Sequence, residues 1–339
     1  MINFKKLKKP FIIAEIGINH EGNIKTAKKL IFEAKKAGAD AVKFQIFKPY
    51  TLANKRSQKS KFQKKSTSQK NPLYKIWQKM ELKFPDLKKL RKYAKKLNIY
   101  FICSVFDIES LSMSRKLKID ALKIASSDIT DEYLQNYLSK EKKPIILSTG
   151  MSEKSEIEKC IKNLKSKNLA ILHCVSLYPC DFKRANLNRI LSLKENFKYT
   201  IGYSDHCIGP IASILSINLG AKIIEKHFTL NKNKIGLDHK LSADPMDLKI
   251  ICDFAKNYKV FFGQKRINPS NFEKSFRKLF RKGIYFRRNI KKGEKILEKD
   301  IIVRRPMNKN NPADYKKIIN KISKKNFLEG DEIKKSFLS

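Results

Sequence analysis

Eight short apolar segments alternate with amphipathic helical segments from residue 11 to about residue 260, and this alternation constrains the fold more than any other feature. The apolar segments are rich in β-branched and aromatic residues, as strands are. The predicted strands cover 11–17, 41–47, 100–106, 121–127, 144–150, 170–176, 200–205 and 222–228. Repeated strand–helix units form a parallel sheet, and eight of them in about 250 residues predict a (β/α)8, or TIM, barrel.

A different pattern follows the barrel. Turn signals at Lys292-Gly293-Glu294 and Glu329-Gly330-Asp331 indicate a small, largely irregular or β-rich domain. The chain of 339 residues is long enough for both parts. We therefore expect a barrel domain at 1–262, a linker at 263–276 and a C-terminal domain at 277–339. The polar insertion at 51–71 is long for a strand–helix connection and predicts a lid over the barrel mouth.

The formal net charge of +43 suggests attraction to nucleic acid or an anionic membrane. The lysines are scattered over predicted helix surfaces, however, and no segment interleaves basic and aromatic residues. We expect neither nucleic acid nor membrane as a partner, and a positive field that helps to collect anionic substrates. The six cysteines form no C-x-x-C pair, and the sequence shows neither a cleavable leader nor a membrane span, which favours the cytoplasm.

Polar residues near the C-terminal ends of the predicted strands are the candidate site, because active sites of TIM barrels lie there. Because side chains two residues apart lie on the same face of a strand, Lys43 and Gln45 share a face. The same holds for Ser204 with His206 and for Glu225 with His227. Lys43 and Lys123 occupy matching places, and two buried lysines indicate either a bound polyanion or pairing with interior carboxylates such as Glu15. The hydroxyls that suit phosphate or carboxylate oxygens belong to Ser104, Ser148 and Ser204.

Two of the five histidines, His206 and His227, end consecutive strands. Their imidazoles should lie side by side over the barrel mouth, and histidine is a common ligand of divalent transition metals. A metal that bridges them is one hypothesis, and two ordinary buried histidines are the alternative.

Seven motifs, in order along the barrel, together resemble the sialic acid synthase family. They are AEIGINHEG (14–22), GADAVKFQ (38–45), KPIILSTGM (143–151), HCVSLYP (173–179), GYSDH (202–206), IIEKHFT (223–229) and GLDHKLS (236–242). The segment NIKKGEKILEKDIIVRRP (289–306) is similar to the antifreeze-like, or SAF, domain that members of this family carry.

The resemblance implies a condensation that depends on a divalent metal, Mn²⁺ or Mg²⁺. The methylene carbon of phosphoenolpyruvate attacks the aldehyde of N-acetylmannosamine or a related N-acylated hexosamine, water adds, and phosphate leaves by C–O cleavage to give N-acetylneuraminate. Legionaminate or pseudaminate is the alternative product. A non-catalytic glycan-binding protein is an alternative of another class, but it would not need both lysines and both histidines at strand ends.

The resemblance also assigns roles to residues. It implies catalytic roles for Glu15, Lys43, Lys123 and Asp205, substrate contacts from Gln45, Ser104, Ser148, Tyr178, Ser204, Asp238 and Arg305, and metal ligation by His206 and His227. It further implies a domain-exchanged homodimer in which the C-terminal domain caps the partner's barrel. Four departures from the family pattern leave the exact sugar open: Val105 replaces a proline, Asp128 stands where Glu is common, Ser176 replaces an Asn seen in some members, and Met307-Asn308-Lys309-Asn310 replaces a glycine-rich turn.

Overall fold

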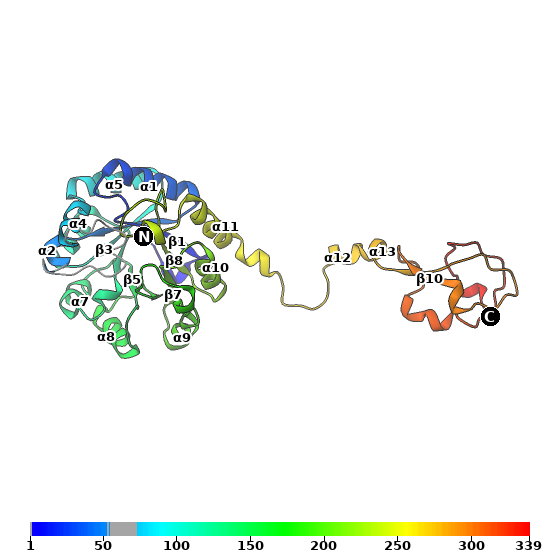
Figure 1. Ribbon diagram of the computed structural model, residues 1–339. Helices are drawn as coiled ribbons and strands as arrows, with labels where there is room; N and C mark the ends of the chain where they lie inside the picture. The colour runs from blue at the N-terminus through cyan, green and yellow to red at the C-terminus, as the bar shows by residue number, and fades with distance from the viewer. Residues whose placement is uncertain (1, 53, 55–72) are drawn as a thin grey trace. The chain divides into compact units, whose positions relative to one another are not determined.

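In the computed structural model, which describes residues 2–52, 54 and 73–339, the larger part of the chain is a closed barrel of eight parallel strands (Figure 1). Strands pair in sequence order, and β8 pairs with β1 to close the barrel. The strands are β1 (Phe11–Gly17), β2 (Ala41–Ile46), β3 (Tyr100–Val105), β4 (Ala121–Ile124), β5 (Ile145–Ser148), β6 (Leu169–Cys174), β7 (Thr200–Asp205) and β8 (Ile223–His227). This architecture confirms the predicted fold class.

Helices surround the barrel (Figure 1). Among the described residues of the barrel unit the helices are α1 (Ile24–Ala37), α2 (Pro49–Leu52), α4 (Leu73–Met80), α5 (Phe84–Lys96), α6 (Ile108–Leu117), α7 (Glu132–Leu138), α8 (Lys154–Leu164), α9 (Arg189–Asn196), α10 (Ile211–Asn218) and α11 (Pro245–Phe262). Local sequence sets their ends, as α1 shows. The Asn23 side chain accepts hydrogen bonds from the backbone N–H groups of Lys25 and Thr26, and Gly38 ends the helix at φ 100°.

The barrel interior changes from apolar to polar along each strand. Its N-terminal half is filled by a cluster that includes Ile13, Ala41, Ala121 and Ile146 and is closed by Phe4 from the N-terminal segment. Because side chains of a strand alternate between its two faces, the next inward positions lie two residues further on, where polar residues stand. The apolar half anchors the strands, and the polar half is free to form a site.

The chain divides into two compact units between Phe261 and Phe262. In the second unit, β9 (Gly283–Phe286) pairs antiparallel with β10 (Ile301–Arg304) over a small apolar core. The segment expected to be a linker contains the short helix α12 (Asn271–Ser275), and α13 (Arg277–Phe280) follows. Most of the unit is irregular or 3₁₀-helical, as the turn signals predict.

Three further expectations concern the chain as a whole. The lid predicted at 51–71 lies outside the described residues, apart from Thr51 and Leu52 in α2 and Asn54. Among the described helices, none is both long and apolar enough to cross a membrane. All six cysteines are free and buried.

Candidate active site

Side chains from all eight strands line a small inner cavity of about 60 Å³ inside the C-terminal end of the barrel. Most come from an inward strand position or the residue just after a strand, and Ser126 and Tyr178 come from the segments that follow β4 and β6. The polar residues of the lining are Glu15, Lys43, Gln45, Ser104, Lys123, Ser126, Ser148, Cys174, Tyr178, Ser204, His206, Glu225 and His227. The structure thus brings together most of the residues that the sequence assigned to the site.

Two lysines and two glutamates form a buried ionic cluster in this cavity. Lys43 Nζ lies 2.8 Å from Glu15 Oε2 and 3.6 Å from Glu225 Oε2. Burial alone would lower the pKa of Lys43, but these carboxylates outweigh burial and raise it. Lys123 Nζ has a longer contact, 3.9 Å to Glu225 Oε1, and burial lowers its pKa. Interior carboxylates therefore keep Lys43 in its charged form, whereas the charged form of Lys123 would be stabilised most by an incoming anion.

Three strand-end hydroxyls surround the ionic cluster. Ser104 Oγ accepts a hydrogen bond of 2.9 Å from Lys43 Nζ, and Ser204 Oγ donates one of 2.9 Å to Glu225 Oε1. Ser148 Oγ is buried and has no hydrogen-bond partner within the described part of the chain. A buried hydroxyl without a partner is costly, so Ser148 is well suited to bind an anionic oxygen.

The two strand-end histidines lie side by side, with ring centroids 5.4 Å apart. His206 Nδ1 is 2.8 Å from the Val175 carbonyl oxygen, which can only accept a hydrogen bond, so Nδ1 carries a proton and the neutral ring would have its lone pair on Nε2. His227 Nδ1 lies 3.4 Å from Asp238 Oδ2. Burial would raise the pKa of Asp238, but His227 outweighs burial and lowers it. A carboxylate beside a ring nitrogen is the arrangement that orients metal-binding histidines.

A larger outer cavity of about 690 Å³ adjoins the inner one. Tyr178 and His227 belong to the lining of both, and Asp238 lines the outer cavity. The Tyr178 ring packs on His206 with centroids 4.1 Å apart. A volume of this size suits a small molecule such as a sugar.

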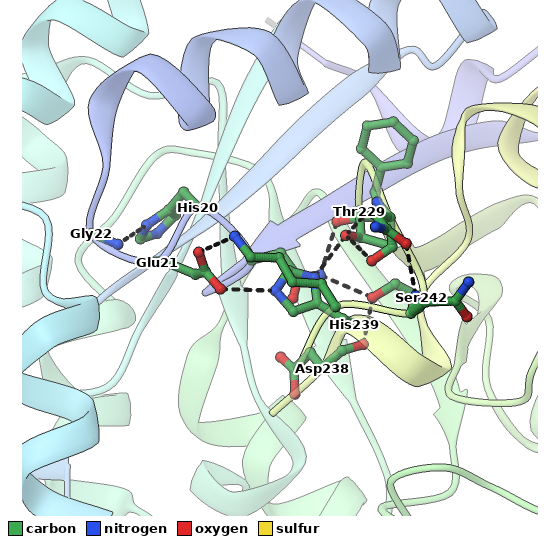
Figure 2. Close-up of polar contacts among 12 residues, drawn as sticks. His20, Glu21, Gly22, Thr229, Asp238, His239 and Ser242 are labelled. Atoms are coloured by element: carbon green, nitrogen blue, oxygen red, sulfur yellow. Dashed lines mark hydrogen bonds and ion pairs between the residues drawn. The ribbon is translucent and has the colours of Figure 1, made fainter. Parts of the chain in front are cut away.

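The loop that carries Asp238 is held by a network of polar contacts (Figure 2). His239 Nε2 lies 3.3 Å from Glu21 Oε1, and His239 Nδ1 lies 2.7 Å from Thr229 Oγ1. Ser242 Oγ donates a hydrogen bond of 2.7 Å to the Asp238 carbonyl. These contacts tie the loop after β8 to the loop after β1 and thereby fix the Asp238 carboxylate at the cavity.

The structure does not bring Asp205 into this cluster. Its side chain points to the opposite face of β7 from that of Ser204 and is fully buried. Asp205 Oδ2 lies 3.1 Å from Lys226 Nζ and accepts a hydrogen bond of 2.6 Å from Ser213 Oγ. This placement does not support the expected catalytic role. The contacts instead fasten β7 to β8 and α10.

Arg305 belongs to the second unit, directly after β10, where its guanidinium lies 5.6 Å from the centre of the Phe280 ring. Its contact with the sugar stays a prediction. Conversely, Glu225 lies in the inner cavity but was not among the expected site residues. Burial would raise its pKa, but Lys123 and Lys43 outweigh burial and lower it. The signal for Glu225 was present, since it precedes His227 by two residues on the same strand.

Comparisons with known proteins agree with this geometry. Residues 30–267 match the NeuB family and residues 281–339 match the SAF domain. The chain is 38% identical to an N,N'-diacetyllegionaminic acid synthase of Campylobacter jejuni over 97% of this chain and 100% of that protein. It is 33% identical to a pseudaminic acid synthase of the same species, over 98% of both chains.

A solved structure shows the same likeness. The N-acetylneuraminic acid (sialic acid) synthetase of Leptospira borgpetersenii, in complex with citrate, superposes with a TM-score of 0.69 at 31% identity. The match covers 79% of this chain and 90% of that one. The family match covers most of the barrel, and the relatives are similar over nearly the whole length of the chain. The chain therefore belongs to the NeuB family of nonulosonic acid synthases and carries a C-terminal SAF domain.

Proposed function

We propose that this protein condenses phosphoenolpyruvate with an N-acylated hexosamine and releases phosphate. The observation that carries the proposal is one cavity that holds Lys43, Lys123, His206 and His227 together. Phosphoenolpyruvate has a phosphate and a carboxylate, which need cations and hydroxyl donors. The sugar reacts as an aldehyde, whose oxygen gains negative charge during attack and needs an electrophile beside it.

The chemistry balances with one water. The methylene carbon of phosphoenolpyruvate bonds to the aldehyde carbon, and the aldehyde oxygen takes a proton to become a hydroxyl. Water adds to the former enol carbon and gives up one proton. The C–O bond to phosphate then breaks, the remaining hydroxyl proton leaves with the phosphate, and a keto group remains. Lys123, Lys43 and Ser148 would bind the anionic groups, and Glu15 would accept the proton of the water.

The two histidines fit a divalent metal such as Mn²⁺ or Mg²⁺. In its neutral form His206 would offer the Nε2 lone pair, and the Asp238 carboxylate lies beside His227. No group of three or more His, Cys, Asp or Glu residues arranged for a metal occurs among the residues described, so further ligands would be water and substrate oxygens. When bound, the ion supplies Lewis acidity at the aldehyde oxygen. Tyr178 packs on His206 and would help to keep its ring in place.

For the sugar we propose a hexosamine with two acetamido groups, which would give a legionaminate-type product. Two observations support this choice over N-acetylmannosamine, the sugar expected from the sequence. The relative compared above that has the highest identity is named for a diacetylated product. The outer cavity also has apolar lining residues, which suit acetyl methyl groups better than hydroxyls.

Phosphate release from phosphoenolpyruvate tests the proposal. The purified full-length protein, with Mn²⁺, should release phosphate with a diacetamido hexose faster than with N-acetylmannosamine, and not with mannose. Release with N-acetylmannosamine as the best substrate would restore the N-acetylneuraminate assignment. No release with any acylated hexosamine would contradict the proposed reaction.

A further inference from the structure

Part of the outer cavity is lined by apolar side chains. Leu52, Trp77, Phe106 and Leu237 contribute to it, next to polar residues such as Asp238. Apolar side chains offer sugar hydroxyls no hydrogen bonds, but they gain from contact with methyl groups and with the C–H faces of a sugar ring. This part of the cavity therefore favours a ligand that has an apolar substituent.

Among these residues, Trp77 presents the largest aromatic surface, and its surroundings fix its orientation. It lies on α4, whose Ile76 is buried in a small cluster with Phe47 and Leu237. The Trp77 ring meets Phe47 edge to face, with centroids 5.4 Å apart and planes at 78°. The indole is partly buried and also lines the cavity, so a ligand meets a ring that is already held in place.

The position of Trp77 also separates it from the reacting centre. Trp77 lines the outer cavity, whereas Lys43 and Lys123 line the inner one. Within the part of the chain described, Trp77 is not a lining residue of the inner cavity. A substrate that spans both cavities would place its anionic and reacting groups at the lysines and its outer substituent at Trp77.

We propose that Trp77 determines sugar specificity by packing its indole face against an N-acyl group of the hexosamine, an inference that rests on the proposed function. Trp77 makes no contact with phosphoenolpyruvate in this arrangement. It selects acylated sugars over their hydroxylated counterparts, because an acyl methyl group buries apolar area against the ring. A hydroxyl group at the same place would lose its hydrogen bonds to water and gain none from the ring.

Steady-state kinetics test the proposal. Trp77→Ala should raise the KM for the acylated hexosamine about tenfold, while the KM for phosphoenolpyruvate and kcat change by less than about twofold. Trp77→Phe keeps a ring and should recover most of the loss. Tyr74→Ala removes an aromatic ring from the same helix without touching the described cavity lining, and its kinetics should match those of the unchanged enzyme.

Fluorescence gives a readout that does not need turnover. Trp77 is the only tryptophan in the sequence, so tryptophan emission reports on this position alone. Addition of the acylated hexosamine to the metal-loaded protein should shift the emission, and mannose, which lacks the acyl group, should not. Phosphoenolpyruvate alone should leave the emission nearly unchanged.

The two measurements separate failure of this inference from failure of the proposed function. An enzyme that turns over acylated hexosamines with the same KM after Trp77→Ala would overturn the role of Trp77 and leave the reaction intact. An equal rise in both KM values would show a structural role instead. If no hexosamine supports turnover and none shifts the emission, both proposals are wrong. An emission shift without turnover would keep the binding role and remove the reaction.

Discussion

At the scale of residues, the two lysines of the inner cavity have different partners, so their removal should have different consequences. Lys43→Met removes the closest cation of both Glu15 and Glu225, which leaves buried carboxylates underpaired and should lower the free energy of unfolding by roughly 3 kcal/mol. Lys123→Met removes a lysine whose only close carboxylate among the described residues is 3.9 Å away, and should cost less than Lys43→Met.

Both lysine changes should nevertheless impair the use of phosphoenolpyruvate. We expect its KM to rise at least about tenfold in each variant, with a smaller change in the KM for the sugar, because each removes a charge that would bind an anionic group. Chemical denaturation and steady-state kinetics measure the two effects separately. Equal loss for both substrates, together with a large loss of stability in Lys123→Met, would show that Lys123 is a structural cation.

His20 should make folding stability depend on pH. It is buried, and burial lowers its pKa from 6.5 to about 4. The unfolded chain therefore binds a proton between these values while the folded chain does not, so stability is full above pH 6.5 and falls as the pH drops to about 4. The loss should approach about 3 kcal/mol. His20→Gln should flatten this part of the curve; unchanged pH dependence would show that other groups cause it.

Much of the inner cavity could be predicted from strand periodicity. The two-residue period of inward positions correctly placed Lys43 and Gln45 together on one strand. It also placed Ser204 and His206 together on another. The same rule excludes Asp205 from that face, yet the resemblance to a family motif had included it. Asp238 could not be found by periodicity, because it lies in a loop whose position depends on contacts with a distant loop.

At the scale of elements, the pair formed by Asp205 and Lys226 fastens β7 to β8. Both side chains are fully buried, so Asp205→Asn leaves an unpaired cation and should lower the free energy of unfolding by roughly 3 kcal/mol. Loss of a proton-transferring group typically costs a factor of about 10² to 10⁴ in rate, whereas we expect kcat to fall by less than about tenfold. A larger fall in kcat at unchanged stability would restore the catalytic role of Asp205.

The existence of the strands was easier to predict than their ends. Several predicted strands continue past the last paired residue, as at 121–127, where β4 ends at Ile124 and a 3₁₀ turn begins at Ser126. Serines typically bound strands, so Ser126 and Ser127 were a signal for the end of β4 that the predicted range passed over. The contacts that join the β1 and β8 loops link residues more than 200 positions apart, such as Glu21 and His239, and no local pattern reports them.

At the scale of the whole molecule, we propose a homodimer in which Arg305 completes the sugar site of the partner's barrel. Residues 263–270, which carry no helix or strand, could span roughly 25 Å if extended. Mixing an Arg305→Ala chain with a Glu15→Ala chain should then restore activity, because one site of each heterodimer has both residues intact. Random exchange should give about a quarter of the wild-type activity.

The subunit exchange itself needs a control, such as differently tagged chains recovered together. Mixtures that have exchanged but show no recovery would mean that each chain caps its own barrel or that Arg305 is dispensable. Neither the barrel unit nor the second unit reveals this arrangement by itself. The sequence could predict both units, but the way they combine depends on surfaces that a pattern along one chain does not contain.

The fate of the bridging oxygen of phosphoenolpyruvate tests the central claim most directly. The protein should be given phosphoenolpyruvate with ¹⁸O between carbon and phosphorus, together with the acylated hexosamine and Mn²⁺. We expect the label in the released phosphate, and a product with the mass of both substrates plus water minus phosphate. Label retained in an organic product, or phosphate released without loss of the sugar, would contradict condensation by C–O cleavage.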